Sequence, residues 1–322
     1  MKAIRVHSPG GPEVLRYEDV EIGEPGPGQV RIRQFAIGLN FIDVYHRTGL
    51  YPLATPFIPG SEGAGEVVTV GEGVEEFLPG DRVAYAGVLG AYAEERLVPA
   101  AQLVKLPGAI DFEVAAAVML KGLTTQYLLR RTFRVEAGQT ILIHAAAGGV
   151  GSLATQWAKH LGATVIGTVG SKEKAEIARK NGCDHVILYR EEDFVARVKE
   201  ITGGAGVPVV YDGVGKATFP ASLDCLAPLG MFVSFGSASG PIDAFNIGIL
   251  AQKGSLFATR PTLGTYTAKR ADLLAMAEDL FDVVQSGAVR VPIDARFPLA
   301  EAEAAHRALE SRATTGATVL LP

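Results

Sequence analysis

The chain has 322 residues, with 48% hydrophobic and 20% charged side chains and a formal net charge of −5. This composition is typical of a globular protein of about two domains, and the acidic balance argues against nucleic acid as a main partner. The opening residues hold no apolar run of signal-peptide length, and charges interrupt the stretches that might span a membrane. Two cysteines, Cys183 and Cys225, are too few for a disulfide framework. We therefore expect a cytoplasmic protein without a membrane partner.

The first 120 residues or so predict an antiparallel, barrel-like domain. Short strand-like runs at 30–36, 65–70, 81–85 and 93–98 are separated by turns rich in glycine and proline. Frequent short strands with such turns are typical of all-β barrels rather than of alternating strands and helices.

From residue 140 onward, strand-like runs alternate with helical patterns. This alternation predicts an α/β fold with a parallel, doubly wound Rossmann sheet and right-handed crossovers. We predict strands at 140–144, 164–169, 185–188, 207–212, 231–235 and 255–259. We predict helices between them at 150–161, 172–181, 191–202 and 216–226, with a shorter one at 245–252.

The tail of the chain carries a long helical pattern followed by a strand, a helix and a last strand. We expect this tail to return to the first domain, so that the parallel-sheet domain is an insertion. The predicted division is 1–122, completed by 263–322, for the barrel-like domain and 123–262 for the parallel-sheet domain.

The turn after the first strand of the parallel sheet matches a dinucleotide-binding signature. Small residues stand at Ala146, where the turn is tight, at Gly148, where the backbone must approach a pyrophosphate, and at Gly151, where the helix presses on the strand. Near the start of the following helix, Gly149 and Val150 would bind the cofactor, because free N–H groups and the positive dipole end attract phosphate there. The alternative is an ordinary strand-to-helix turn, since small residues fill such turns too and the first position is Ala rather than Gly. The flanking strand and helix favour the cofactor.

The end of the second parallel strand predicts NADPH rather than NADH. In NAD-dependent folds an acidic side chain at this place accepts hydrogen bonds from the ribose hydroxyls. This chain has Ser171, Lys172 and Lys174 instead, and these groups would bind a 2′-phosphate that a carboxylate would repel. Two alternatives remain open: the lysines form a solvated helix start, or Glu173 turns back toward the ribose.

With these features, the chain closely resembles the zinc-free quinone oxidoreductases of the medium-chain dehydrogenase/reductase superfamily, the zeta-crystallin group. The resemblance covers essentially the whole chain and includes HSPGGPEVL at 7–15, GLNFIDVYHRTGLYP at 38–52, PGSEGAGEV at 59–67 and the signature at 138–159. The segments at 7–15 and 38–52 are specific to this branch. The resemblance implies a GroES-like catalytic domain beside the Rossmann domain, NADPH as the cofactor and a quinone as the substrate.

The same resemblance argues against zinc. Metal-dependent relatives have a Cys where this chain has Asn40 and a His where it has Ser61, and they carry a four-cysteine lobe that two distant cysteines cannot form. The six histidines show no i, i+4 pair of the kind that binds metal on a helix. We therefore predict a metal-free enzyme, for which alcohol oxidation is unfavourable because no Lewis acid stabilises an alkoxide.

The resemblance implies a catalytic set around residues 38–52. Asn40, Asp43 and Tyr45, with Tyr51 just after, would line the cleft for nicotinamide and quinone, and Arg260 would face it from the end of the sixth strand. Asn40 would bond the nicotinamide ribose or the substrate, and Asn40 and the tyrosines would act as donors to a developing oxyanion. The tyrosine rings also suit stacking on a quinone. The alternatives are half-buried core tyrosines and, for Arg260, a surface ion pair.

Further cofactor contacts are implied in the same way. Thr124 would point its hydroxyl at the nicotinamide region, or else bond back to its own helix. The remaining contacts are a 2′-phosphate clamp and a backbone contact with the carboxamide. The clamp would comprise Lys174, Tyr189 and Arg312, and the backbone contact Phe235 and Gly236.

We therefore expect hydride transfer from NADPH to a quinone, with transfer of single electrons left open. The nearest alternative is reduction of the C=C bond of α,β-unsaturated aldehydes or ketones, for which a tyrosine would serve as proton donor. A second is a binding role, because some relatives bind RNA or accumulate in the lens. Pairing across a two-fold axis would cover the edge strand at 254–259, so we expect a homodimer.

Overall fold

The computed structural model describes residues 1–311 and 316–322, and the chain forms two compact units. The first comprises Met1–Leu123, Thr267–Gln285 and Val291–Pro322, and the second comprises Thr124–Tyr266 and Ser286–Arg290. The sequence places domain boundaries at 122/123 and 262/263, beside unit boundaries at 123/124 and 266/267. It does not anticipate that the short segment 286–290 groups with the second unit.

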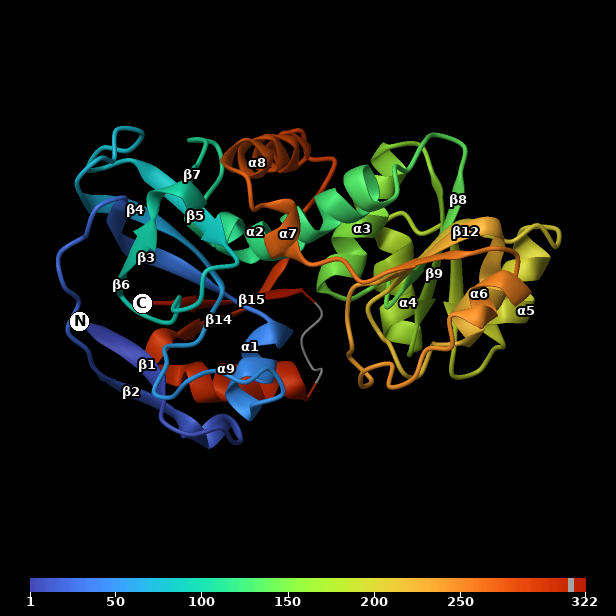
Figure 1. The fold of residues 1–322 in the computed structure, drawn as a ribbon, viewed down its shortest axis with the longest axis horizontal. Coiled ribbons are helices and arrows are strands. Elements are labelled where there is room, and N and C mark those ends of the chain that lie inside the picture. The colour runs from blue at the N-terminus through green and yellow to red at the C-terminus, as the bar shows by residue number, and fades with distance from the viewer. Residues whose placement is uncertain (312–315) are drawn as a thin grey trace. The chain divides into compact units, whose positions relative to one another are not determined.

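The second unit contains a six-stranded parallel sheet in the order β10-β9-β8-β11-β12-β13, which confirms the predicted doubly wound α/β fold (Figure 1). Ile141, Leu142 and Ile143 of β8 are wholly buried, as expected for a central strand covered on both faces. The strands are β8 (Thr140–His144), β9 (Thr164–Val169), β10 (His185–Leu188), β11 (Val207–Asp212), β12 (Leu226–Ser234) and β13 (Phe257–Thr259). The helices are α3 (Gly149–His160), α4 (Lys172–Lys180), α5 (Phe194–Ile201), α6 (Gly248–Gln252) and α7 (Leu263–Tyr266), with a π-helical turn at Leu128–Thr132 and a 3-10 turn at Ala221–Cys225.

The helix predicted at 216–226 is wrong. The Asp212 carboxylate accepts hydrogen bonds from the backbone N–H groups of Val214 and Gly215, at 2.7 and 2.9 Å, and from the Thr218 hydroxyl at 2.6 Å. These bonds hold the chain in a tight turn that competes with a regular helix. A short 3-10 turn follows, and β12 already begins at Leu226, earlier than predicted.

The first unit is built on a sheet in the order β14-β15-β3-β4-β5-β7, with β6 also paired to β3, beside a hairpin of β1 and β2. Its pairs are antiparallel as predicted, except that β14 and β15 run parallel. The strands are β1 (Lys2–Val6), β2 (Leu15–Asp19), β3 (Gln29–Leu39), β4 (Glu62–Val70), β5 (Arg82–Ala86), β6 (Glu95–Pro99), β7 (Val104–Lys105), β14 (Ile293–Pro298) and β15 (Ala317–Leu321). The helices are α1 (Phe41–Thr48), α8 (Arg270–Gln285) and α9 (Ala302–Glu310), and α2 (Phe112–Tyr127) begins here and ends in the second unit.

The strand order brings two chemically active segments together. β3 ends at Leu39, and Asn40 then opens α1 with an extended backbone (φ −135°, ψ 157°). β4 begins at Glu62 and runs antiparallel to β3, with Gly63 opposite Ile37. Asn40 and Glu62 therefore lie at the same end of the sheet.

None of the helices within residues 1–311 and 316–322 combines the length and the apolar character needed to cross a membrane.

Candidate functional site

The turn between β8 and α3 has the geometry of an anion cradle. Ala145 adopts the left-handed conformation (φ 54°), and the Gly148 N–H donates to its carbonyl oxygen at 2.8 Å. A Cβ atom at Gly151 would overlap that same carbonyl, so α3 can approach β8 this closely only with glycine there. The sequence gives the tight-turn role to Ala146, whereas the strained residue is Ala145 and Ala146 is wholly buried.

The N-terminus of α3 leaves backbone donors available to a ligand. Gly148 is the N-cap, and glycine has no side chain with which to cap the helix. The first hydrogen bond of the helix runs from the Ser152 N–H to the Gly148 carbonyl at 2.7 Å. The N–H groups of Gly149, Val150 and Gly151 come before this bond and therefore have no acceptor within the helix. Gly148 and Gly149 are also exposed. Exposed donors at the positive end of a helix fit a phosphate.

The end of β9 gathers the groups predicted to hold a 2′-phosphate. Ser171 is the N-cap of α4, and its hydroxyl accepts the Lys174 backbone N–H at 3.4 Å. A Cβ at Gly170 would lie 2.9 Å from the Tyr189 hydroxyl, which places Tyr189 against this turn. A hydrogen bond from the Ser171 hydroxyl holds the pKa of Glu173 below its usual range. Arg312, the third predicted clamp residue, lies outside the described residues.

Lys174 is only partly exposed, yet its ammonium has no ion-pair partner within residues 1–311 and 316–322. An unpaired cation in the first turn of α4, which Ser171 caps and whose preceding Gly170 lies against Tyr189, is suited to an anionic ligand.

Arg260 holds the loop that follows β12 through several hydrogen bonds. Its guanidinium donates to the carbonyl and hydroxyl oxygens of Ser234, both at 3.1 Å, to the Gly236 carbonyl at 2.8 Å and to the Ser237 hydroxyl at 3.3 Å. The Phe235 N–H is bonded to the Asp212 carbonyl at 2.8 Å. Arg260 therefore shapes the loop that presents Phe235 and Gly236, a role that the sequence did not suggest.

Thr124 lies at the start of the second unit, next to a pair of stacked rings. Tyr127 and Tyr266 stack with centroids 4.5 Å apart and planes at 9°. Burial raises the pKa of Tyr127 to about 12, while a hydrogen bond with Thr124 acts against that shift. The Thr124 hydroxyl therefore has a neighbour in its own unit.

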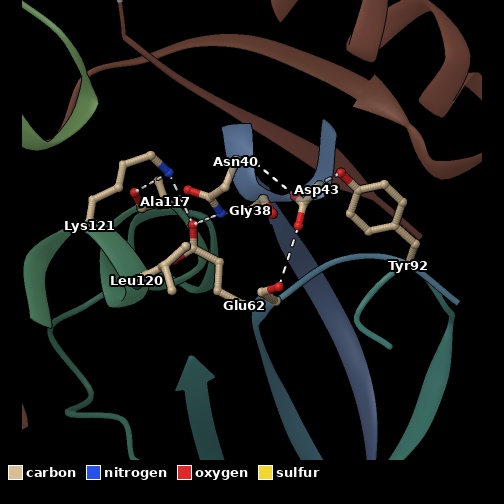
Figure 2. A network of polar contacts seen from close by, with 9 residues as sticks. Gly38, Asn40, Asp43, Glu62, Tyr92, Ala117, Leu120 and Lys121 are labelled. Carbon is tan, nitrogen blue, oxygen red and sulfur yellow. Dashed lines mark hydrogen bonds and ion pairs between the residues drawn. The ribbon is translucent and has the colours of Figure 1, made fainter. Parts of the chain in front are cut away.

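In the first unit, Asn40 is the centre of a buried polar network (Figure 2). Its side-chain Nδ2 donates to Glu62 Oε1 at 2.7 Å and to the Gly38 carbonyl at 3.4 Å. The same Glu62 oxygen accepts from Lys121 Nζ at 3.1 Å, and Oε2 accepts the Leu120 backbone N–H at 2.6 Å. Glu62 has no exposed surface, so hydrogen bonds and the Lys121 charge have to compensate its carboxylate for the loss of water.

Asp43 holds the backbone of Asn40 from the other side. Its Oδ2 accepts the Asn40 N–H at 2.9 Å and the Tyr92 hydroxyl at 3.1 Å, and its Oδ1 accepts the Ser61 hydroxyl at 3.4 Å. The resemblance places Asp43 among the cleft-lining residues; in the structure it lies in the first turn of α1 with its side chain completely buried. Burial raises the pKa of Asp43 to about 7, although the bonds from Asn40 and Tyr92 oppose that shift.

A directional chain of hydrogen bonds leads from Asp43 to α9. Burial, with the nearby Arg47 charge, lowers the pKa of His306 to about 3, so its ring is neutral. Arg47 lies 3.1 Å from His306 Nδ1 and can only donate, which leaves the proton on Nε2 to donate to the Tyr92 hydroxyl at 3.0 Å. Arg47 also makes a two-pronged ion pair with Glu310, at 2.8 and 2.9 Å.

The two predicted tyrosines lie beside each other at the end of α1. Tyr45 and Tyr51 meet edge to face with centroids 5.2 Å apart, and the Tyr51 N–H donates to the Tyr45 carbonyl at 3.1 Å. Tyr51 keeps 38% of its surface exposed, so it is available to a ligand.

Sequence reasoning missed most of the network around Asn40 and Asp43. Glu62 entered it only as part of a motif, and the missed residues were Arg47, Tyr92, Lys121 and His306. One signal was present: Lys121 is a charge inside the apolar run 114–123, where an unpaired lysine would be costly. In the part of the chain that the structure describes, no three His, Cys, Asp or Glu side chains form a metal-ligand group.

Comparison with known proteins places these features in context. Residues 26–108 match the alcohol dehydrogenase GroES-like domain, and residues 149–278 match the zinc-binding dehydrogenase family. The chain is 58% identical to a quinone oxidoreductase of Pseudomonas aeruginosa, over 100% of this chain and 99% of the relative. It is 49% identical to a 2-haloacrylate reductase of a Burkholderia species, over 98% of each. The structure of Escherichia coli quinone oxidoreductase complexed with NADPH matches with a TM-score of 0.98 at 49% identity, over 100% of both chains.

The raised pKa of Asp43 predicts a pH dependence of stability. The pKa of the Asp43 carboxyl is raised from its ordinary value of 3.8 to about 7 in the native protein. Between these two pH values the native protein binds the carboxyl proton more tightly than the unfolded chain does, so the contribution of Asp43 to the free energy of unfolding falls as the pH rises. The slope is at most about 1.4 kcal/mol per pH unit, and it vanishes above pH 7 or so. Asp43→Asn should remove it, as measured by urea unfolding between pH 4 and 8. The exposed Asp243→Asn is the control, and an unchanged slope in Asp43→Asn would contradict the assignment.

Proposed function

The chain belongs to the quinone oxidoreductases of the medium-chain dehydrogenase/reductase superfamily, and we propose that it reduces quinones with NADPH. The observation that carries the proposal is the turn from Ala145 to Gly151, where small residues and uncapped N–H groups open a helix beside a parallel strand. When bound, NADPH supplies the hydride.

The residues that would hold the cofactor are those at two neighbouring strand ends. The N–H groups of Gly149, Val150 and Gly151 would bind the pyrophosphate. Lys174 and Tyr189, with the Ser171 turn, would bind the 2′-phosphate, supported by the unpaired ammonium of Lys174 in the described structure. Thr124, Phe235, Gly236 and Arg312 remain predicted contacts to the cofactor.

We assign positioning, rather than proton transfer, to the polar groups of the first unit. Tyr45 and Tyr51 offer flat faces and hydroxyl tips that would orient a quinone ring. Asn40 would bind the ligand directly, and Asp43 acts through Asn40, because it is buried and bonded to the Asn40 backbone. A hydroquinone anion is stable enough to take its proton from water, so the reaction needs no dedicated acid.

The proposed reaction is independent of zinc. Asn40 and Ser61 stand where metal-dependent relatives have zinc ligands. The Asn40 amide nitrogen donates a hydrogen bond to Glu62, and the Ser61 hydroxyl donates one to Asp43. An amide and a hydroxyl in these roles serve the hydrogen-bond network rather than a zinc ion, which prefers thiolate and imidazole.

A second candidate function is reduction of an activated C=C bond on the same fold. The similarity to a 2-haloacrylate reductase, at 49% identity over almost the whole chain, favours it specifically. Such a reaction leaves an enolate, and Tyr45 or Tyr51 would then donate the proton.

We propose a cytoplasmic homodimer. Both cysteines are free and buried, which suits a reducing compartment. β13 is an edge strand with one neighbour, and Phe257 on it is 56% exposed. Ile247 and Leu229 of the same unit are exposed by 75% and 67%, so pairing of two such edges would cover apolar surface.

The substrate assignment is tested by following NADPH oxidation with 1,4-benzoquinone, 9,10-phenanthrenequinone and a 2-alkenal. We expect turnover of the quinones and little of the alkenal. The reverse order would move the enzyme to the C=C reductases, and no consumption of NADPH with any of the three would contradict both functions.

Lys174→Met tests the 2′-phosphate clamp. Loss of one charge-assisted hydrogen bond should raise the KM for NADPH by about 10- to 100-fold while leaving the KM for NADH unchanged. Lys180→Met, at the other end of α4, is the matched control and should change neither. An equal rise in the KM for NADPH and for NADH would show that Lys174 does not bind the 2′-phosphate.

Size-exclusion chromatography with light scattering tests the dimer. The wild type should have twice the chain mass of 33.9 kDa, and Phe257→Arg should shift it toward the single chain. Leu274→Arg, at an exposed apolar residue of the first unit, is the control. A wild-type mass of one chain across micromolar concentrations would refute the proposal.

A further inference from the structure

The strongest unexplained feature is the wholly buried carboxylate of Glu62, to which the proposed function assigns no role. Glu62 accepts hydrogen bonds from Asn40, Lys121 and the Leu120 backbone, and Figure 2 shows its carboxyl group between the Asn40 amide and the Lys121 ammonium. Lys121 is 13% exposed and also donates to the Ala117 carbonyl at 3.4 Å. Burying this pair is costly, which calls for a function.

Close packing fixes where the carboxylate lies. A Cβ atom at Gly38 would overlap both the Glu62 carboxyl group and the Ala116 carbonyl oxygen, so only glycine leaves room for the carboxylate to reach Asn40. The Leu120 N–H, at 2.6 Å from Oε2, then determines which carboxylate oxygen faces Asn40.

The carboxylate decides how the Asn40 amide is oriented. A carboxylate only accepts hydrogen bonds, so Asn40 must turn its NH₂ group toward Glu62. The second contact of Nδ2 goes to the Gly38 carbonyl, so both amide hydrogens have acceptors inside the protein. The Asn40 side-chain oxygen, Oδ1, is therefore the atom that can contact a ligand. This oxygen has two lone pairs, and the hydrogen bond of the capping box with Asp43 uses at most one of them.

We propose that Glu62 and Lys121 are positioning residues that make Asn40 a hydrogen-bond acceptor toward its ligand. Lys121 supplies the positive charge that compensates the buried Glu62, and Glu62 sets the amide. The inference rests on the proposed function, since the ligand group it selects is a donor on the nicotinamide half of NADPH: a ribose hydroxyl or the carboxamide NH₂. Asn40 then cannot donate a hydrogen bond to a developing oxyanion, the role expected from the resemblance, and Tyr45 and Tyr51 are the remaining donors.

Glu62→Gln tests the inference by inverting the amide. In this variant the fixed Leu120 N–H still requires an oxygen at the Oε2 position. The Lys121 ammonium, on its flexible stem, can leave the Oε1 position for the Ala117 carbonyl that it already contacts, so the new NH₂ group faces Asn40. Asn40 must then turn its oxygen inward and present NH₂ to the ligand. We expect the affinity for NADPH, measured by the fluorescence of the bound cofactor, to fall about tenfold or more. The reason is that a hydrogen bond is lost and the Asn40 NH₂ group then faces a donor of the ligand. Binding of 2′,5′-ADP, which has the 2′-phosphate but no nicotinamide half, should stay within about twofold by calorimetry.

Exchanging the two groups should restore the acceptor. The double variant Asn40→Asp/Glu62→Gln places an amide where the carboxylate was and a carboxylate where the amide was, with the charge beside Lys121 conserved. One oxygen of the new carboxylate accepts from the new amide, and the other faces the ligand. We expect its NADPH affinity to return to within about threefold of the wild type. A merely structural role for Glu62 would make the second substitution add to the loss instead.

The control is Glu66→Gln, the same change on the same strand, at a partly exposed residue that pairs with Arg33 at 3.4 Å. It should alter neither affinity. An unchanged NADPH affinity in Glu62→Gln, an equal loss for NADPH and 2′,5′-ADP, or a double variant weaker than the single one would overturn the inference. If Glu62→Gln does not fold, the charge-conserving double variant decides: affinity within threefold supports the inference, and a tenfold loss contradicts it. None of these titrations uses a quinone, so a failure of quinone turnover in the wild type would count against the proposed function alone.

Discussion

The arrangement of the candidate site depends on two carboxylates that lie out of reach of water. Glu62 and Asp43 are wholly buried, and a buried charge destabilises a fold unless donors surround it. Removing one partner from such a group typically costs on the order of 3–5 kcal/mol. The donors are therefore held in one arrangement, and Asn40, which gives its amide to Glu62 and its backbone N–H to Asp43, is fixed by both. Preorganisation of this kind is what a reaction driven mainly by positioning requires.

The two units reach this rigidity by different means. The second unit uses backbone: a left-handed Ala145, a close contact at Gly151 and free N–H groups at the start of α3. The first unit uses side chains, with a chain of hydrogen bonds that runs from Asp43 through Tyr92 and His306 to Arg47. Because His306 is neutral and Arg47 can only donate, each bond in this chain has a single direction. The first turn of α1 and the α9 helix are thereby tied together.

The sequence predicts local patterns better than it predicts partners. The strand–turn–helix at 140–160 and the parallel sheet follow from short-range alternation, and both are confirmed. The helix predicted at 216–226 fails because one side chain, Asp212, binds several backbone and hydroxyl groups, which no periodicity records. The resemblance places Asp43 among the cleft residues, and the structure shows it buried, with hydrogen bonds from Asn40, Ser61 and Tyr92 that no local pattern records.

The hydrogen-bond network around Asn40 is the least accessible to sequence reasoning. Glu62 is 22 residues from Asn40, and Lys121 is 59 from Glu62, so only the antiparallel pairing of β3 with β4 and the packing of α2 bring them together. The resemblance names Asn40 as a site residue, but it does not say which end of the amide faces a ligand. That orientation depends on an acceptor-only neighbour, which becomes visible when the side chains are placed.

We propose that this fold delivers a hydride to a quinone by positioning, without a metal ion. The most direct measurement is a single-turnover reaction of chelator-treated, metal-analysed protein with NADPH deuterated at the transferred C4 position. We expect a full rate without metal and a primary isotope effect on NADPH oxidation. A rate that disappears on metal removal and returns with zinc would contradict it, as would oxidation of NADPH that shows no isotope effect when the chemical step limits the rate.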